Sequence, residues 1–179
     1  MQEIQFQLRQ WKAEDVKGLV KAADNPKIAA NLRNVFPCPY TVEDAEWFIQ
    51  DCIAKDGNRQ LVRAIEKDHM VIGCISITGK DDIYEKSAEL GYWLAESCWG
   101  QGIMTQAVKR ICREAFAAWD LKRIFAEPFA HNEGSKRVLE KAGFTCEGTM
   151  RDGVFKDGQV FSYCMYALLR KEAEALYGK

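Results

Sequence analysis

Hydrophobic and polar positions alternate along several stretches of the chain, and this period of two predicts β-strands. The first such stretch holds Ile4, Phe6 and Leu8. Further strand-like runs follow at 60–65, 70–78, 87–94, 121–127, 144–148 and 160–168. Asp68-His69 and the Lys-Asp-Gly sequence at 156–158 are turn-forming residues, so we expect each to join two neighbouring strands in a hairpin.

Apolar residues elsewhere recur at helical spacing and predict helices at 13–23, 42–54 and 101–118, a short helix after Asn132, and a marginal one at 170–177. Asn25-Pro26 is expected to end the first of these. Thr41 is expected to cap the second helix, with Asp44 as its capping-box partner. We expect Gly143 to end the short helix in a left-handed conformation. The buried side chains expected in the second helix are Ala45, Trp47, Phe48, Ile49 and Ile53.

The predicted order is β-α-α-β-β-β-α-β-α-β-β, and it contains no repeat, linker or low-complexity segment. At 179 residues the chain is most simply one domain, residues 1–179. This order predicts an α+β protein whose mixed sheet carries helices on both faces.

Composition narrows the classes of function. Apolar residues make up 47% of the chain, charged residues 28%, and the net charge is −1, so nothing indicates direct nucleic-acid binding. No apolar run approaches membrane-spanning length, and the N-terminus does not resemble a signal peptide. Seven scattered cysteines without a C-x-x-C pair, and two histidines outside any cluster, predict a cytoplasmic protein with reduced thiols and no metal.

The stretch "CWGQGIMT" places Gly100 and Gly102 between a predicted strand and a predicted helix. Such a loop brings backbone N–H groups and the positive end of a helix dipole together, which suits phosphate or pyrophosphate. No lysine follows, so a triphosphate loop is excluded. A dinucleotide site needs a third glycine where Thr105 stands, and the acidic Asp120 precedes the strand it should follow. On the two glycines alone, a strand–helix corner that binds nothing is about as good an interpretation as a phosphate-binding site.

The residues around this loop favour a binding site over a plain corner. "AELGYWLAESCWGQGIMTQAV" followed by "HNEGSKRVLEKAGF" resembles the GNAT (GCN5-related N-acetyltransferase) superfamily, and more narrowly its RimJ/RimL-type branch of ribosomal-protein alanine N-acetyltransferases. "FPCPYTVEDAEWFI" resembles that branch's proline loop and second helix. The resemblance covers about residues 4–169. It implies the acyl-CoA N-acyltransferase (GNAT) fold, with a mixed, mostly antiparallel central sheet.

The resemblance also implies acetyl-CoA as co-substrate. The pyrophosphate would lie on the glycine loop, the pantetheine arm would pair with the strand end, and the N–H of Leu94 would face the thioester oxygen. The implied cofactor-binding residues are Tyr92, Trp93, Leu94, Gln101, Gly102, Ile103, Met104, Thr105, Asn132 and Ser135.

Two residues are candidates for the chemistry. Ser135 stands where the branch carries a hydroxyl partner for the thiolate, although it is equally a first-turn serine that satisfies helix N–H groups. Glu89 lies within an apolar strand and is the candidate base; the alternative is a strand-end glutamate that faces water. Leu139 replaces the tyrosine that many GNAT enzymes use as proton donor, and Ser162 replaces an acidic residue of the branch.

The predicted activity is transfer of an acetyl group from acetyl-CoA to a primary amine, either a protein N-terminus or a small molecule. Phe36, Tyr40 and Trp93 are the expected lining of the acceptor pocket. The alternative is a CoA-binding regulatory module with little or no turnover, and Leu139 and Ser162 motivate it. A nucleotide-dependent oxidoreductase is a distant third. The chain is expected to act as a monomer or homodimer, away from membranes.

Overall fold

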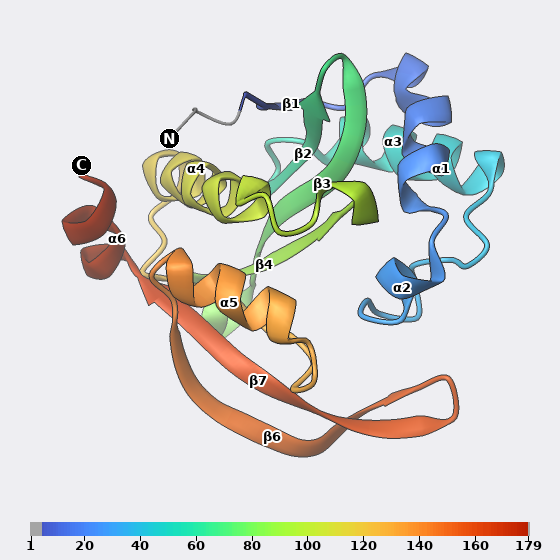
Figure 1. The fold of residues 1–179 in the computed structure, drawn as a ribbon. Helices are drawn as coiled ribbons and strands as arrows, with labels where there is room; N and C mark the ends of the chain where they lie inside the picture. The colour runs from blue at the N-terminus through green and yellow to red at the C-terminus, as the bar shows by residue number, and fades with distance from the viewer. Residues whose placement is uncertain (1–4, 179) are drawn as a thin grey trace.

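The computed structural model describes residues 5–178, which contain a seven-stranded sheet (Figure 1). In chain order its strands are β1 (Gln7–Arg9), β2 (Gln60–Lys67), β3 (Met70–Gly79), β4 (Ser87–Leu94), β5 (Arg123–Ala126), β6 (Thr145–Lys156) and β7 (Gln159–Leu169). In space the order is β1-β2-β3-β4-β5-β7-β6. Only β4 and β5 pair in parallel among these strands. The prediction of a mixed, mostly antiparallel sheet is therefore confirmed, whereas the predicted strand residue Ile4 lies outside the described residues.

Helices cover both faces of the sheet, as predicted (Figure 1). The helices are α1 (Val16–Ala23), α2 (Pro26–Ala29), α3 (Val42–Lys55), α4 (Ile103–Ala118), α5 (Glu133–Lys141) and α6 (Arg170–Tyr177). One face carries α1 and α3, and the other carries α4, α5 and α6. None of the helices in residues 5–178 combines the length and the apolar character needed to cross a membrane.

Two hydrophobic clusters fill the space between the sheet and its helices. The inner strand β3 contributes to both clusters, because successive side chains of a strand point to opposite faces. Ile75 and Ile77 are fully buried in the larger cluster under α4, while Cys74 is buried in the smaller cluster under α1 and α3. This double burial explains why the central strands are nearly continuous apolar runs in the sequence.

Several helix and strand ends lie where local sequence signals predict them. Thr41 and Asp44 form the capping box of α3: the Thr41 hydroxyl accepts the Asp44 N–H at 3.2 Å, and the Asp44 carboxylate accepts the Thr41 N–H at 2.9 Å. Gly143 follows α5 with φ of 91°, a left-handed conformation. Asp157 and Gly158, with φ of 50° and 77°, form the turn of the β6–β7 hairpin.

Two elements differ from their predictions. Asn25-Pro26 ends the first helix but also starts another, α2, because Asn25 Oδ1 accepts the Lys27 N–H at 2.9 Å and proline suits the first helical position. β6 extends to Lys156 instead of ending near 148, because long antiparallel pairing with β7 supports its mostly exposed residues.

Two side chains of α3 were wrongly predicted to be buried. Trp47 is 68% exposed and Ile53 is 53% exposed. The buried line of this helix runs through Ala45, Ile49 and Cys52. Trp47 stands two positions from both Ala45 and Ile49, about 200° around the helix from each, so it faces outward.

Candidate active site

The parallel strands β4 and β5 diverge, and this divergence creates the candidate site. Within residues 5–178, β4 pairs with β3 from Ala88 to Leu94, but it pairs with β5 only at Ser87–Glu89. Beyond Glu89 one edge of β4 is therefore open. A parallel pair that separates in this way leaves room for an extended ligand beside the open edge.

The register of β4 determines which backbone groups face this gap. Ala95 donates its N–H to Ile72 O at 2.7 Å, so the antiparallel pattern turns alternate residues of β4 toward β3. The backbone groups of Tyr92 and Leu94 consequently point away from β3, into the gap. The Leu94 carbonyl accepts the indole N–H of Trp99 at 2.7 Å. Trp99 thereby ties the glycine loop to the end of β4.

The glycine loop leads directly into the N-terminus of α4. Gly100 and Gly102 have φ of 73° and 79°, and no side chain caps the helix. The first intrahelical bond runs from Gln106 N–H to Gly102 O at 3.2 Å, so the three preceding N–H groups lack intrahelical partners. Their side chains give no cap either: Ile103 and Met104 are buried in the core, and Thr105 is half-buried.

Gln101 organises the outer side of this loop through its side chain. It donates to Ser97 O at 3.0 Å and accepts from Lys67 Nζ at 3.4 Å. Lys67 thus brings a positive charge to the Gln101 side chain of the loop, and the first turn of α4 contains no acidic residue. The loop is chemically suited to a pyrophosphate group.

Ser135 lies on the first turn of α5, across from β4. Its N–H donates to Asn132 Oδ1 at 3.1 Å, which makes Asn132 the N-cap of the helix. Its hydroxyl lies 2.7 Å from the hydroxyl of Tyr92, and the Tyr92 hydroxyl also lies 3.3 Å from Ser135 O. Burial raises the pKa of Tyr92, and the hydrogen bond to Ser135 offsets part of this rise.

Glu89 lies where the two strands begin to separate, and it is held between two cations. Its Oε2 is 2.5 Å from Lys80 Nζ, and its Oε1 contacts Arg33 Nη2. The same Arg33 nitrogen lies 3.1 Å from Glu127 Oε2, just after β5. The Glu89 side chain is only 17% exposed, so it is paired and does not simply face water.

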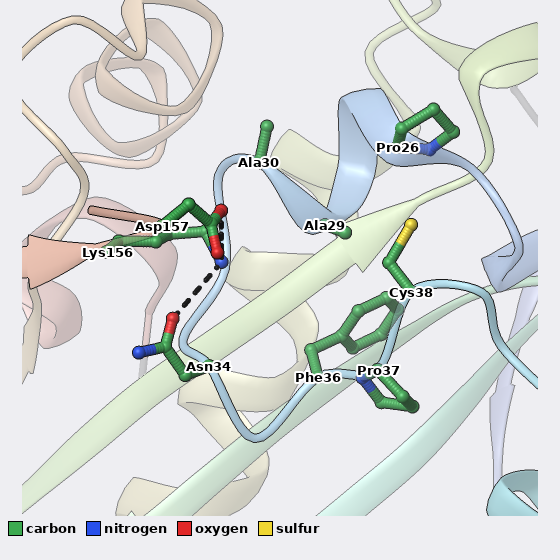
Figure 2. A pocket seen from close by; sticks show the side chains of 9 residues that line it. All are labelled: Pro26, Ala29, Ala30, Asn34, Phe36, Pro37, Cys38, Lys156 and Asp157. Atoms are coloured by element: carbon green, nitrogen blue, oxygen red, sulfur yellow. Dashed lines mark hydrogen bonds and ion pairs between the residues drawn. The ribbon is translucent and has the colours of Figure 1, made fainter. Parts of the chain in front are cut away.

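A cavity of about 470 Å³ opens beside the loop between α2 and α3 and the β6–β7 turn (Figure 2). Its lining residues are Pro26, Ala29, Ala30, Asn34, Phe36, Pro37, Cys38, Lys156 and Asp157. The largely buried Lys156 reaches Asn34 Oδ1 and Asp157 Oδ2, each at 3.5 Å. This contact brings the β6–β7 hairpin to one side of the cavity.

The three predicted pocket residues form one aromatic group, but only Phe36 lines this cavity within the described chain. The Phe36 ring lies 5.1 Å from Tyr40 and 5.9 Å from Trp93, centroid to centroid. Tyr40 is 5% exposed and belongs to the smaller core cluster, and Trp93 packs against that cluster. Tyr40 and Trp93 therefore pack against the Phe36 ring and are not among the residues that line the cavity.

Coenzyme A fits these residues on two structural grounds: the uncapped N–H groups at the start of α4 and the open backbone edge at Tyr92 and Leu94. A metal centre has no such support in the described residues, where no group of three or more His, Cys, Asp or Glu side chains is arranged to hold an ion.

Several contributors to the site were not predicted from the sequence. The side chain of Tyr92, as distinct from its backbone, was overlooked, as were Arg33, Lys80 and Lys156. Arg33 lies in a loop without periodicity, and its two carboxylate partners are 56 and 94 positions away in the chain. Only for Tyr92 did a signal exist, because a strand tyrosine facing the helical layer needs a partner for its hydroxyl.

Comparison with known proteins agrees with this geometry. Residues 5–145 match the family described as "Acetyltransferase (GNAT) domain". The chain belongs to this family, whose enzymes use acetyl-CoA as co-substrate.

Individual relatives indicate which branch of the GNAT family the chain resembles. The "Putative ribosomal N-acetyltransferase YdaF" of Bacillus subtilis (strain 168) is 36% identical over 107 residues, which cover 60% of this chain and 58% of that protein. The "Probable N-acetyltransferase YjcK" of the same organism is 37% identical over 131 residues, covering 69% of this chain and 72% of that protein. The solved structure of Mycobacterium smegmatis RimJ, in complex with CoA-disulfide, superposes with a TM-score of 0.82 at 25% identity and covers 93% and 83% of the two chains.

These findings confirm the predicted GNAT fold, the resemblance to the RimJ/RimL-type branch, the acyltransferase class and the co-substrate. They do not favour the alternative of a regulatory module without turnover.

Proposed function

We propose that the protein transfers the acetyl group of acetyl-CoA to a primary amine, with a protein N-terminus as the leading acceptor and a small amine as the other. The open edge of β4 beside the uncapped start of α4 carries this proposal. The name of the relative YdaF, which refers to ribosomal N-acetylation, supports a protein acceptor.

The backbone of the loop and strand would hold the co-substrate. In this proposal the N–H groups of Gly102, Ile103, Met104 and Thr105 bind the pyrophosphate, and Gln101 keeps the loop in place. Tyr92, Trp93 and Leu94 lie along the pantetheine arm, and the Leu94 N–H donates to the thioester oxygen. Asn132 holds the start of α5 beside it.

Acetyl-CoA supplies an acetyl group activated as a thioester, and two side chains would serve the transfer. Glu89, directly or through a water molecule, accepts the proton that the attacking amine nitrogen must lose. Ser135 donates a hydrogen bond to the sulfur as the bond from carbon to sulfur breaks and the electron pair moves onto sulfur. The ion pairs of Glu89 with Arg33 and Lys80 support this role by position, because they hold its carboxylate at the point where β4 and β5 separate.

The acceptor would approach from the side of the cavity in Figure 2, with Phe36 as its apolar wall and with Tyr40 and Trp93 behind that ring. Its reactive nitrogen would reach the point where β4 and β5 separate. We further propose that residues 1–179 act as one N-acetyltransferase domain in the cytoplasm, as a monomer or homodimer, without a metal and without direct nucleic-acid or membrane partners.

Isothermal titration with acetyl-CoA and CoA tests the co-substrate, and release of free thiol tests turnover. The thiol assay uses a panel of peptides with free N-termini, the same peptides with blocked N-termini, and small amines. We expect release of thiol with the free peptides and none with the blocked ones. Binding without turnover on any amine would overturn the enzymatic proposal, and absence of binding at millimolar CoA would overturn the site itself.

A further inference from the structure

We infer that Tyr92 is a positioning residue that sets the direction in which the Ser135 hydroxyl donates its hydrogen. The inference rests on the proposed role of Ser135 beside the sulfur of CoA. Tyr92 reaches across from β4 to α5, and its hydroxyl lies 2.7 Å from Ser135 Oγ and 3.3 Å from Ser135 O. Ser135 is otherwise fixed through its backbone, because Asn132 accepts its N–H at 3.1 Å.

The two hydroxyl groups hold two hydrogens, and these can be arranged in two ways. In the first, Ser135 donates to the Tyr92 oxygen and Tyr92 donates to the Ser135 carbonyl at 3.3 Å, so both hydrogens are used within the pair. In the second, Tyr92 donates to Ser135 Oγ at 2.7 Å. The Ser135 hydrogen is then available to a third group.

The second arrangement suits a negatively charged sulfur in the gap. A hydrogen bond to a charged acceptor is about twice as strong as one between neutral groups, so a thiolate draws the Ser135 hydrogen toward itself. The hydrogen of Tyr92 then turns from the longer contact to the shorter one. Each hydroxyl polarises the next, which strengthens the bond to sulfur.

Tyr92 keeps its own proton throughout. Burial raises the pKa of this phenol, so it remains protonated and donates only a hydrogen bond. In the transfer itself the carbon–sulfur bond breaks, the electron pair moves onto sulfur, and the amine nitrogen forms the new bond and loses its proton toward Glu89. Neither Tyr92 nor Ser135 changes its charge, and no further reactant is needed.

The pKa of the CoA thiol in the bound complex tests this relay without any acceptor. It is measured from the ultraviolet absorbance of the thiolate as the pH is varied, at CoA concentrations shown by titration calorimetry to saturate each variant. We expect Tyr92→Phe to raise this pKa by about half a unit to one unit, the size expected for weakening one hydrogen bond. Ser135→Ala should raise it further.

A double-mutant cycle separates action through Ser135 from an independent effect. If Tyr92 acts through the serine, Tyr92→Phe changes nothing further in a Ser135→Ala background. Equal shifts in both backgrounds would overturn the inference, as would an unchanged thiol pKa in Tyr92→Phe. Absence of CoA binding by the wild-type protein would contradict the proposed function, and it is distinguishable from failure of the inference about Tyr92.

Tyr166→Phe is the matched control. Tyr166 also reaches α5 from a strand, where its hydroxyl donates to Glu140 Oε1 at 2.9 Å, and it is 3% exposed. This variant loses a buried tyrosine–helix hydrogen bond at the other end of α5, so it should leave the thiol pKa unchanged. A shift as large as that of Tyr92→Phe would mean that the effect is a general loosening of the helix. With an acceptor amine that the protein acetylates, Tyr92→Phe should lower kcat about threefold to tenfold and change the KM for acetyl-CoA less than about twofold.

Discussion

The two sides of the candidate site are built from different materials. The side proposed for the co-substrate is mostly backbone: the N–H groups at the start of α4 and the open edge of β4. The side proposed for the acceptor consists of side chains from distant parts of the chain, with Arg33 joined to Glu89 and Glu127, and Asn34 joined to Lys156.

This difference has a physical consequence. Backbone groups in regular elements are fixed by the fold, so any sequence that forms the corner presents nearly the same donors. Ion pairs between loops depend on individual side chains, several of them exposed, and each pair can be exchanged for a competing charge. The first side therefore suits a constant co-substrate, and the second suits an acceptor that differs between related proteins.

The largest effect is expected from Gly102→Glu. The new side chain places a carboxylate beside the N–H groups proposed to bind pyrophosphate, so the Kd for CoA should rise at least about 100-fold. Glutamate also strains a residue with φ of 79° by about 1–2 kcal/mol. Titration calorimetry measures the affinity and thermal unfolding the stability.

Gly57→Glu is its matched control, because Gly57 has φ of 83° and open space around it in the turn before β2. Both variants should lose similar stability, but only Gly102→Glu should lose CoA. A similar loss of affinity in both would assign the effect to strain and not to charge at the loop.

The contrast between the two sides also explains how far the sequence could be interpreted. Strand alternation, the capping box of Thr41 and Asp44, and Gly143 are local signals, and each agrees with the structure. The glycine loop is local too, so its neighbours along the chain sufficed to suggest its ligand. Arg33 carries no local signal, because its role depends on partners that only the folded sheet brings near it.

Trp47 shows the same limit in another form. Its residue type favours the core, and only the angular position of Ala45 and Ile49 on α3 shows that it must face outward. Register within an element thus outweighs the preference of a residue type.

Glu89→Gln comes second in expected size. An amide keeps the shape of the side chain but cannot accept the amine proton, so kcat should fall about 100-fold near neutral pH. The loss should shrink as the pH rises, since the amine then loses its proton to solvent. Glu127→Gln removes the other carboxylate partner of Arg33 and should cost much less. Equal losses in the two variants would show that Glu89 serves only to hold Arg33.

Alkylation of Cys38 by N-ethylmaleimide should act on the acceptor side alone. Cys38 is exposed and lines the cavity in Figure 2, whereas Cys112 of α4 is fully buried, which raises its thiol pKa and protects it. We expect kcat/KM for the acceptor to fall about tenfold through misplacement of the acceptor, with an unchanged Kd for CoA. Cys38→Ala should abolish the effect, while Cys146→Ala, which removes the other exposed thiol, should not. Weakened CoA binding after alkylation would contradict the separation of the two sides.

Arg33→Met is expected to have the smallest effect and the opposite sign. One guanidinium nitrogen lies between the carboxylates of Glu89 and Glu127, the place where a protonated acceptor amine would also be stabilised. Removing this competitor should lower the acceptor KM about threefold. The Arg33 side chain is 64% exposed, so the ion pairs contribute only about 0–1 kcal/mol and thermal stability should change little.

Lys27→Met serves as the comparison, because it removes an equally exposed cation that pairs with Glu96, on the loop after β4. It should leave the acceptor KM unchanged. Added salt should lower the acceptor KM of the wild-type protein less than the substitution does. Salt weakens the attraction of the acceptor amine to Glu89 and Glu127 as well as that of the Arg33 guanidinium, so the two effects partly cancel. A raised acceptor KM in Arg33→Met would instead show that Arg33 stabilises the acceptor side. The ion pairs would then be as rigid as the backbone of the glycine loop, and the contrast between the two sides would fail.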